Sequence, residues 1–480
     1  MKKFNEFEER IEHLLDTYEV PGCIVAIAEY GNIVYEKSVG FKNKEKALPI
    51  DRDTVFGLAS LTKSFTCTAV MQLVEEEKIN LHAPITDYLP NFKIENKNDL
   101  EKITVHHFMN HSSGIPPLPS LDYAMRRKRN DEFLVDYLES NADEITIDTF
   151  ESLMNYISDA NVQLFAQPGK LFSYSNDAYG LLGAVIEQAS GIPYEQYVVE
   201  NIIHPCGMKR TYFTREEYGN DENITTCYEL NELTEGNVVY EVQDWWDAPA
   251  MRATGFLKST ARDMITYSQL FINKGIVNGK RILTEKSVQQ MVYPYLKMDP
   301  ERFYGYGLTI TPNYFGDTLI EHGGSLQSIS SKFGMILEKG ISVIVLANLS
   351  GFPASRTMEL ALNAYFNRDI DAHHFAYEAY SVDDETLASY KGTYRSGELE
   401  DITIELNNGE AEFYYKGKKY PIKWIRKHVF LAEMDDTLEP IEIVVDKNGT
   451  PTAMSIFHRI VPKLTDAGNL KGVYHGKFND

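Results

Sequence analysis

The hydrophobic pattern changes near residue 372, and this change most constrains the fold. Beyond it, short segments alternate apolar and polar residues with a period of two, and Asn-Gly turns separate some of them. This pattern is typical of short antiparallel strands. A chain of 480 residues is also longer than one hydrophobic core usually supports. The sequence therefore predicts two domains, 1–372 and 383–480, joined by a polar and aromatic connector.

The first predicted domain has strands at both ends and helices between them. An amphipathic N-terminal helix precedes two β-rich runs around the Gly31-Asn32 turn, and strands return over residues 303–350. Residues 100–260 are mostly helical, with a helical run over 177–190 that ends at Gly191, a natural C-cap. We therefore expect an α+β fold: an antiparallel sheet flanked by helices with an all-helical subdomain, followed by a small antiparallel β-barrel.

Charge and composition argue against several classes of partner. A net charge of −23 would repel nucleic acid and anionic membrane surfaces. No stretch has the length and apolarity of a membrane span, and the N-terminus lacks a signal-peptide pattern, so a cytoplasmic location is expected. The cysteines show no CxxC spacing and predict neither a disulfide framework nor a zinc site; they are Cys23, Cys67, Cys206 and Cys227.

Ser60 and Lys63 form a Ser-x-x-Lys pair at the start of a helix predicted over residues 60–77. A serine hydroxyl needs a base to remove its proton and donors to stabilise the oxyanion. Side chains three residues apart on a helix share one face, so Lys63 can reach Ser60. A buried lysine with a lowered pKa can act as such a base. Two polar residues on the rim of an ordinary amphipathic helix would show the same spacing. The pair alone therefore does not distinguish a catalytic site from such a helix.

Two further short motifs carry polar groups. Tyr174 and Asn176 are two residues apart, a spacing that places both side chains on one side of an extended backbone. His322, Gly323 and Gly324 lie in a predicted strand, where paired glycines often mark close approach of a ligand or another backbone. Tyr218 and Tyr365 also begin Tyr-x-Asn triplets, but one lies in an acidic loop and the other ends a helix.

Ser-x-x-Lys, Tyr-x-Asn and His-Gly-Gly, in this order, resemble the signature elements of penicillin-binding-protein-like serine hydrolases, related to class C β-lactamases and peptidase family S12. The resemblance covers roughly residues 8–365 and includes flanking phrases such as DTVFGLASLTKSFT and ITVHHFMNHSSGI. The C-terminal part resembles the lipocalin-like domains appended to some D-amino-acid peptidases of this family. The likeness is limited to its pattern of short alternating strands.

The resemblance implies a role for each motif residue. Ser60 would be the nucleophile that forms an acyl-enzyme, and Lys63 and Tyr174 would share the proton transfers. Asn176 would orient Lys63 and bind the substrate amide, together with the strand of Gly323 and Gly324. The oxyanion hole would consist of two backbone N–H groups, those of Ser60 and Ser325.

His322 stands where many members of this family have a lysine. A histidine is at most half-charged near neutral pH and offers less to a substrate carboxylate, which disfavours efficient β-lactamase or D-Ala-D-Ala carboxypeptidase activity. Members with a histidine here resemble aminopeptidases and esterases. Simple packing of His322 at the strand end is the alternative.

We therefore expect a hydrolase without cofactor or metal that acts on short, D-residue-containing peptides. An esterase or weak β-lactamase is the alternative, and a catalytically idle protein that binds peptidoglycan fragments or β-lactams is the alternative from another class. The expected partner is a small molecule or short peptide, with homo-oligomerisation left open. His106, His107 and His111 lack the acidic partner of a metal motif and are expected to pack and to bond loops.

Overall fold

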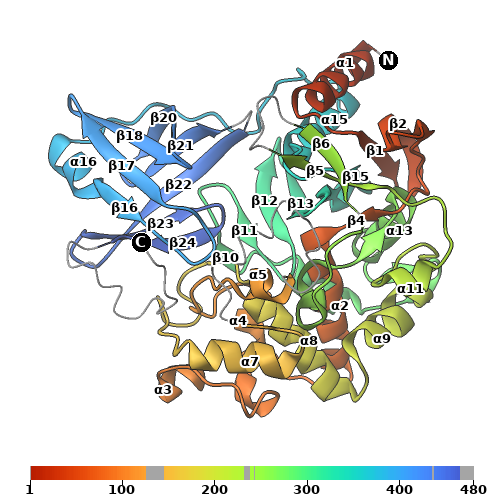
Figure 1. Cartoon of the computed structure of the whole chain (residues 1–480), viewed down its shortest axis with the longest axis horizontal. Coiled ribbons are helices and arrows are strands. Elements are labelled where there is room, and N and C mark those ends of the chain that lie inside the picture. Colours follow the sequence, from red (N-terminus) through yellow and green to blue (C-terminus); the bar gives the residue numbers. More distant parts are fainter. Residues whose placement is uncertain (1, 126–144, 232–237, 243, 435–436, 465–480) are drawn as a thin grey trace.

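The computed structural model describes residues 2–125, 145–231, 238–242, 244–434 and 437–464. Its largest element is an antiparallel sheet of nine strands (Figure 1). In spatial order these are β10 (Leu296–Lys297), β11 (Phe303–Tyr304), β12 (Thr309–Tyr314), β13 (Asp317–Leu326), β14 (Ile329–Ile336), β15 (Ile341–Ala347), β1 (Gly22–Glu29), β2 (Asn32–Asn43) and β3 (Leu48–Pro49). The first and last parts of this domain thus share one sheet, as the sequence predicts.

Helices cover both faces of the sheet. The alternate residues of β1 separate the two cores: Cys23, Val25 and Ile27 pack with α1 and α15, whereas Ile24 and Ala26 pack in the larger core, which includes α2, α8 and α13. The α-helices of this domain are α1 (Lys2–Thr17), α2 (Thr62–Glu75), α3 (Lys97–Leu100), α4 (Val105–Met109), α5 (Ser120–Met125), α7 (Phe150–Asp159), α8 (Asn176–Ser190), α9 (Tyr194–Val198), α10 (His204–Cys206), α11 (Arg215–Tyr218), α12 (Arg252–Gly255), α13 (Ala261–Ile272), α14 (Glu285–Met291) and α15 (Ala354–Tyr365).

Caps and turns fix the ends of several elements, and the predicted C-cap at Gly191 is confirmed. The helix α8 ends before Gly191, whose left-handed φ of 80° closes its C-terminus. Thr260 caps α13 by accepting a hydrogen bond from the Asp263 N–H at 3.0 Å. The hairpin of β1 and β2 is also present, but its turn residues are Tyr30 and Gly31 rather than Gly31 and Asn32, because these two adopt the positive φ values that a two-residue turn requires.

The second domain differs from the predicted barrel. Its strands form two antiparallel sheets, and the described residues show no single closed ladder. One sheet contains β16 (Gly392–Tyr394), β17 (Ile402–Asn407), β18 (Glu410–Tyr415) and β19 (Lys418–Tyr420), and the other contains β20 (Ile422–Arg426), β21 (Val429–Met434), β22 (Thr437–Val445), β23 (Pro451–Ile456) and β24 (Arg459–Pro462). Pro421 separates β19 from β20, and because proline cannot donate to a ladder, the chain changes sheets there.

One hydrophobic core fills the space between these two sheets. It contains Tyr390, Ile402, Phe413, Phe430 and Met454 among others, and all its buried members lie between Leu387 and Val461. The short helix α16 (Asp384–Tyr390) contributes to it, with Asp383 as its N-cap. A core built only from this stretch is what a separate domain would have, and the domain bounds 1–372 and 383–480 stay a prediction.

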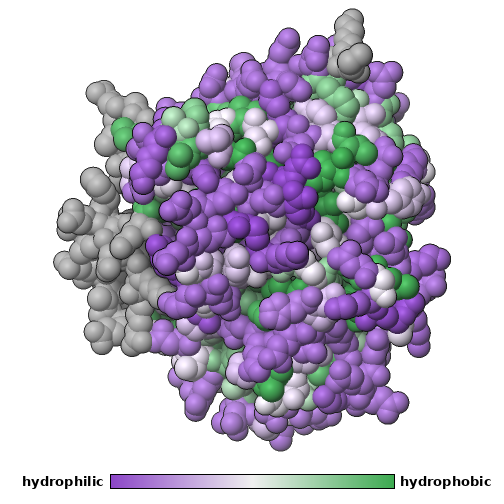
Figure 2. Space-filling view, turned by 90° about the vertical axis from the view of Figure 1, so that its right-hand side faces the viewer, coloured by the Kyte–Doolittle hydropathy of each residue, from purple (hydrophilic) through white to green (hydrophobic). Residues whose placement is uncertain are grey.

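One face of the molecule is largely polar. Figure 2 shows a face on which hydrophilic side chains prevail and apolar ones are scattered among them. A search of the described helices found none with both the length and the apolar character that a bilayer crossing requires. Both observations agree with the acidic composition of the chain.

Candidate active site

Ser60 lies in a short 3-10 turn, Ala59–Leu61, directly before α2. The sequence predicted it inside the helix itself. The turn follows from the backbone of Ala59, whose φ of 46° is left-handed, a conformation that costs a non-glycine residue about 1 kcal/mol or more. Such strain is often found beside reactive groups, and here it lies one residue before the predicted nucleophile.

Lys63 is fully buried on the first turn of α2, and its amine faces three oxygen atoms. Nζ lies 3.1 Å from Ser60 Oγ, 3.0 Å from Asn176 Oδ1 and 2.7 Å from the backbone oxygen of Thr254. Burial, and after it the positive charge of Arg459, hold the pKa of Lys63 well below its ordinary value. The structure therefore brings Ser60, Lys63 and Asn176 together.

Tyr174 lies beside the same amine. The centre of its ring is 4.7 Å from Lys63 Nζ, so the phenol lies next to the Ser60–Lys63 pair. Burial nevertheless raises the pKa of Tyr174, so the phenol is protonated at neutral pH. Asn176 is the first residue of α8, and the extended Ser175 before it is the N-cap, so the segment that leads into this helix positions both groups.

His111 holds the segment that leads into α8 through two hydrogen bonds. Its carbonyl oxygen accepts a hydrogen bond from Ser173 N at 2.9 Å, and its Nδ1 accepts one from Ser175 N at 3.0 Å. These bonds flank Tyr174 on both sides in sequence. His106 and His107 instead bond Tyr306 and Thr104, and among the described residues no cluster of three His, Cys, Asp or Glu side chains could hold a metal ion.

His322 lies buried on β13, with both ring nitrogens engaged by the protein. Nδ1 is 2.6 Å from the Gly323 carbonyl oxygen, which can only accept, so Nδ1 carries the proton and Nε2 accepts from Tyr304 Oη at 2.8 Å. Burial, followed by the charge of Lys63, lowers the pKa of His322 to about 3. His322 is therefore neutral at physiological pH and supplies no charge to a substrate.

The two glycines of β13 have different surroundings. A Cβ atom on Gly324 would lie 2.4 Å from the Leu58 carbonyl oxygen and 3.1 Å from Ser60 N, so this strand passes directly over the serine turn. A Cβ on Gly323 would meet nothing closer than 3.8 Å. Ser325 follows on the same strand and is exposed. The oxyanion role of the Ser60 and Ser325 N–H groups stays a prediction.

The neutral state of His322 predicts a specific pH dependence of stability. An unfolded histidine binds a proton below about pH 6.5, whereas the folded one does not until far lower pH, so wild type should lose stability as pH falls. Relative to His322→Gln, the free energy of unfolding of wild type should fall by about 2 kcal/mol between about pH 7.5 and pH 5.0. Urea unfolding at several pH values measures this difference.

His13→Gln is the matched control, because His13 lies exposed on α1. It measures the effect of removing an exposed imidazole under the same conditions. If the His322→Gln difference does not change with pH, His322 titrates alike in the folded and unfolded states, and its assignment as a buried neutral imidazole is wrong.

Sequence reasoning missed three contributors to this site. Thr254 supplies a backbone oxygen, which no motif reveals. His458 and Arg459 come from the second domain: the His458 carbonyl oxygen accepts a hydrogen bond from Tyr174 N at 2.8 Å, and the Arg459 guanidinium lies 4.5 Å from the centre of the Tyr174 ring. In the sequence, the only sign of this contribution was a basic residue, Arg459, directly after a tight hairpin turn.

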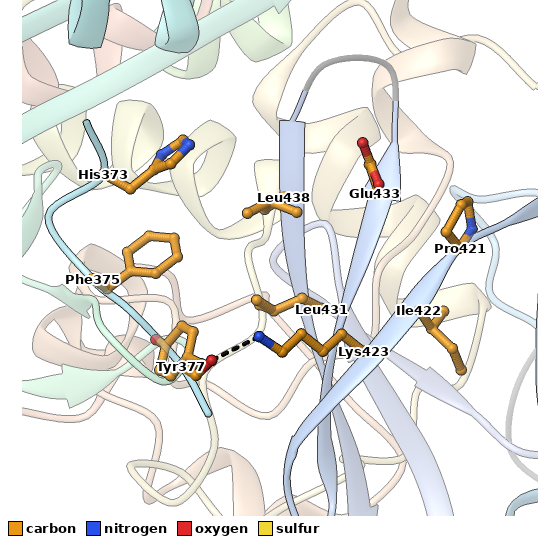
Figure 3. A pocket seen from close by; sticks show the side chains of 9 residues that line it. All are labelled: His373, Phe375, Tyr377, Pro421, Ile422, Lys423, Leu431, Glu433 and Leu438. Carbon is orange, nitrogen blue, oxygen red and sulfur yellow. Dashed lines mark hydrogen bonds between the residues drawn. The ribbon is translucent and has the colours of Figure 1, made fainter. Parts of the chain in front are cut away.

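A cavity of about 270 Å³ lies elsewhere, between the interdomain connector and the second domain (Figure 3). Its walls include Phe375 and Tyr377 on one side and Leu431 and Leu438 on the other, and Lys423 Nζ donates to the Tyr377 carbonyl oxygen at 2.7 Å. None of its lining residues belongs to the cluster around Ser60.

Comparisons with known proteins agree with this fold. The Beta-lactamase family profile matches residues 7–366, and the chain belongs to this family. Protein flp of Staphylococcus aureus strain MW2 is 24% identical over 385 residues, covering 80% of this chain and 69% of that protein. Members of the β-lactamase-fold family are serine hydrolases.

Two solved structures are similar. The octameric penicillin-binding protein homologue from Pyrococcus abyssi superposes with a TM-score of 0.68 at 28% identity, covering 96% of this chain and all of that one. A D-stereospecific amidohydrolase from Streptomyces sp. gives a TM-score of 0.57 at 25% identity, covering 72% of this chain and 94% of that one. The first match extends over the second domain, because it leaves only 4% of this chain uncovered.

Proposed function

We propose that this protein is a serine hydrolase of peptidase type S12 that forms an acyl-enzyme on Ser60 and cleaves amide bonds in short, D-residue-containing peptides. The observation that carries the proposal is the arrangement of the Lys63 amine between Ser60 Oγ and two carbonyl oxygens, those of Asn176 and Thr254. In the neutral amine, the two N–H groups donate to those carbonyl oxygens. The lone pair then points at the serine hydroxyl, as a general base requires.

The reaction follows from this geometry. Lys63 takes the Ser60 proton as Oγ attacks the substrate carbonyl carbon, and the oxyanion that forms lies between the Ser60 and Ser325 N–H groups. The protonated Tyr174, adjacent to Lys63, relays a proton to the leaving nitrogen as the C–N bond breaks. Water then hydrolyses the ester on Ser60, and Lys63 serves again as the base.

A neutral His322 favours peptidase or esterase action over chemistry that depends on a cation at this position. The Streptomyces relative is described as D-stereospecific, which supports a D-residue substrate here. Esterase action is the second candidate, because an ester needs the same nucleophile and oxyanion site with a better leaving group.

Labelling with a fluorophosphonate followed by intact-mass measurement tests the acyl-enzyme. Wild type should gain one adduct, and Ser60→Ala should gain none. Ser64→Ala is the matched control, since the Ser64 hydroxyl is buried on the same helix and bonds the Leu61 carbonyl oxygen instead. An equal adduct on Ser60→Ala would contradict the assignment, and an unlabelled wild type would favour the idle binding protein.

Turnover assays separate the two substrate classes. D-aminoacyl p-nitroanilides, their L counterparts and p-nitrophenyl esters should be compared by kcat/KM. Faster D-anilide cleavage than L-anilide cleavage supports the proposed peptidase, and ester cleavage without anilide cleavage supports the esterase. Homo-oligomerisation is a separate proposal, supported by the octameric state of the Pyrococcus homologue and testable by light scattering.

A further inference from the structure

The second domain closes one side of the active site through the turn between β23 and β24. Phe457 and His458 form this two-residue turn and both adopt positive φ, 46° and 65°, as a tight hairpin requires. Besides the bond between Tyr174 N and the His458 carbonyl oxygen, Ile460 N donates to Ser173 Oγ at 3.3 Å. The turn is thus bonded to the segment that carries Tyr174.

Buried polar contacts hold this turn in place. Arg302 of the first domain pairs with Asp299 at 2.5 Å and donates from Nη2 to His458 Nε2 at 3.3 Å. Because a guanidinium can only donate, His458 accepts and is neutral at this nitrogen, and burial holds its pKa well below the usual range. The turn is therefore a fixed wall of the site.

The guanidinium of Arg459 lies beside Tyr174, and one of its nitrogens, Nη2, is left free by the described residues to bind a ligand. Its Nε pairs with Glu398 at 2.5 Å, and its Nη1 donates weakly to the Phe457 carbonyl oxygen at 3.4 Å. Within the part of the chain that the structure describes, Nη2 makes no hydrogen bond. The side chain keeps 15% of its surface exposed, so it is mostly desolvated and still reachable.

Other cations near the site are already engaged. Lys63 bonds the three oxygens described above, Lys332 pairs with Glu321 at 3.1 Å, and Arg302 is held by Asp299. His322 is neutral. Arg459 is also paired, but Glu398 occupies only its Nε edge, and a guanidinium can bind a second carboxylate through its remaining N–H groups.

We propose that Arg459 forms a carboxylate-binding subsite for the leaving group, so that the enzyme favours peptides whose scissile amide lies next to a free C-terminal carboxylate. This inference rests on the proposed function. The leaving nitrogen takes its proton through Tyr174 and must lie against this residue, and in a C-terminal amino acid the carboxylate is two bonds from that nitrogen. The carboxylate then falls beside the guanidinium that stacks on the Tyr174 ring.

The reaction balances with the peptide and water as its only reactants. Ser60 Oγ forms an ester with the acyl carbon, the C–N bond breaks, and the departing amine gains the proton first taken from the serine. Water later adds its hydroxyl to the acyl carbon as the bond to Ser60 Oγ breaks, and its proton returns to Oγ. The second product is a free amino acid whose carboxylate Arg459 holds until release.

Binding to Ser60→Ala tests the subsite without any chemistry. Isothermal titration calorimetry should compare N-acetyl dipeptides with a free C-terminus against the same peptides as C-terminal amides, in D and L forms. The free acid should bind about ten-fold tighter or more. Ser60→Ala/Arg459→Gln should bind the acid and the amide equally, and Ser60→Ala/Arg459→Lys should fall between.

Two further variants test whether the preference for the free acid depends on Arg459 itself. Glu398→Gln in the Ser60→Ala background removes the competing carboxylate and should increase the preference for the acid. Arg395→Gln is the matched control, since Arg395 pairs with Asp401 on the surface of the same domain. Melting temperatures identify any variant that fails to fold, and the Glu398 variant then carries the test.

The inference is overturned if Ser60→Ala shows no acid preference or binds neither peptide. It is also overturned if the preference survives Arg459→Gln. In enzymes with Ser60 intact, an equal loss of turnover on acid and amide would show that Arg459 only positions Tyr174. Failure of the proposed function can be told apart from failure of this inference. The first would appear as a Ser60 that fluorophosphonate does not label, whereas the binding preference is measured without the nucleophile.

Discussion

Lys63→Met should reduce the rate of Ser60 acylation about a thousand-fold. In the proposed mechanism Lys63 removes the serine proton, because the phenol of Tyr174 stays protonated at neutral pH. Methionine keeps a similar length and fills the buried site without an amine. The rate of fluorophosphonate labelling, followed by intact mass, measures the effect.

The pH profile gives this prediction a second, independent readout. Only the neutral amine accepts a proton, so acylation by wild type should rise with pH through the pKa of Lys63, which burial places well below its ordinary value. The residual rate of Lys63→Met should lack this rising limb. A profile that kept the same limb in the variant would assign the base to another group.

Lys258→Met is the matched control. Lys258 is also a buried lysine with a pKa lowered by burial, but its Nζ donates to the Phe213 carbonyl oxygen at 2.7 Å rather than to Ser60. Both variants lose a buried amine and should lose stability, as their melting temperatures will show. Only Lys63→Met should lose acylation by orders of magnitude, and comparable losses would indicate a general folding defect.

Gly324→Ala should lower kcat/KM at least a hundred-fold, whereas Gly323→Ala should have at most a tenth of that effect. The added Cβ on residue 324 would lie 2.3 Å from Ser331 Oγ and 2.4 Å from the Leu58 carbonyl oxygen, so the strand or the serine turn must shift. Overpacking of this kind also costs about 1–3 kcal/mol of stability. Kinetics on the best anilide or ester substrate and urea unfolding measure the two effects.

The pair of variants is informative because the two glycines are neighbours on one strand. A Cβ atom on Gly323 would have no neighbouring atom closer than 3.8 Å, so its alanine variant adds the same methyl group without a collision. Equal losses in both variants would mean that the strand tolerates no side chain at all. Equal tolerance would mean that the contact between β13 and the Ser60 turn is unimportant for the reaction.

Local sequence patterns predicted the parts of the site that one segment determines. The Gly191 cap of α8 depends on neighbours in sequence and appears as expected, and the Ser60–Lys63 spacing likewise needs only one helical turn. The left-handed Ala59 was not predictable, because nothing in its residue type favours positive φ. The separation of the C-terminal strands into two sheets was also missed, since alternation fixes the faces of strands but not their pairing across Pro421.

The contribution of the second domain could not be predicted for a different reason. Arg459 and Glu398 lie more than 200 residues beyond Tyr174 in sequence, and their position depends on how two separately formed cores dock. No spacing rule connects residues across such an interface. Tyr174 and His322, by contrast, were predicted because their short motifs keep a fixed order along the chain.

The central position of β1 has a consequence for how the chain folds during synthesis. This strand lies between β2 and β15 and pairs Cys23 with Ala347, so one of its edges stays open until more than 300 further residues have been made. Pairing between such distant segments makes folding slow, and an open apolar edge invites association with other chains. Nascent chains that stop before residue 341 should therefore aggregate or bind chaperones, whereas completion of β15 should release them.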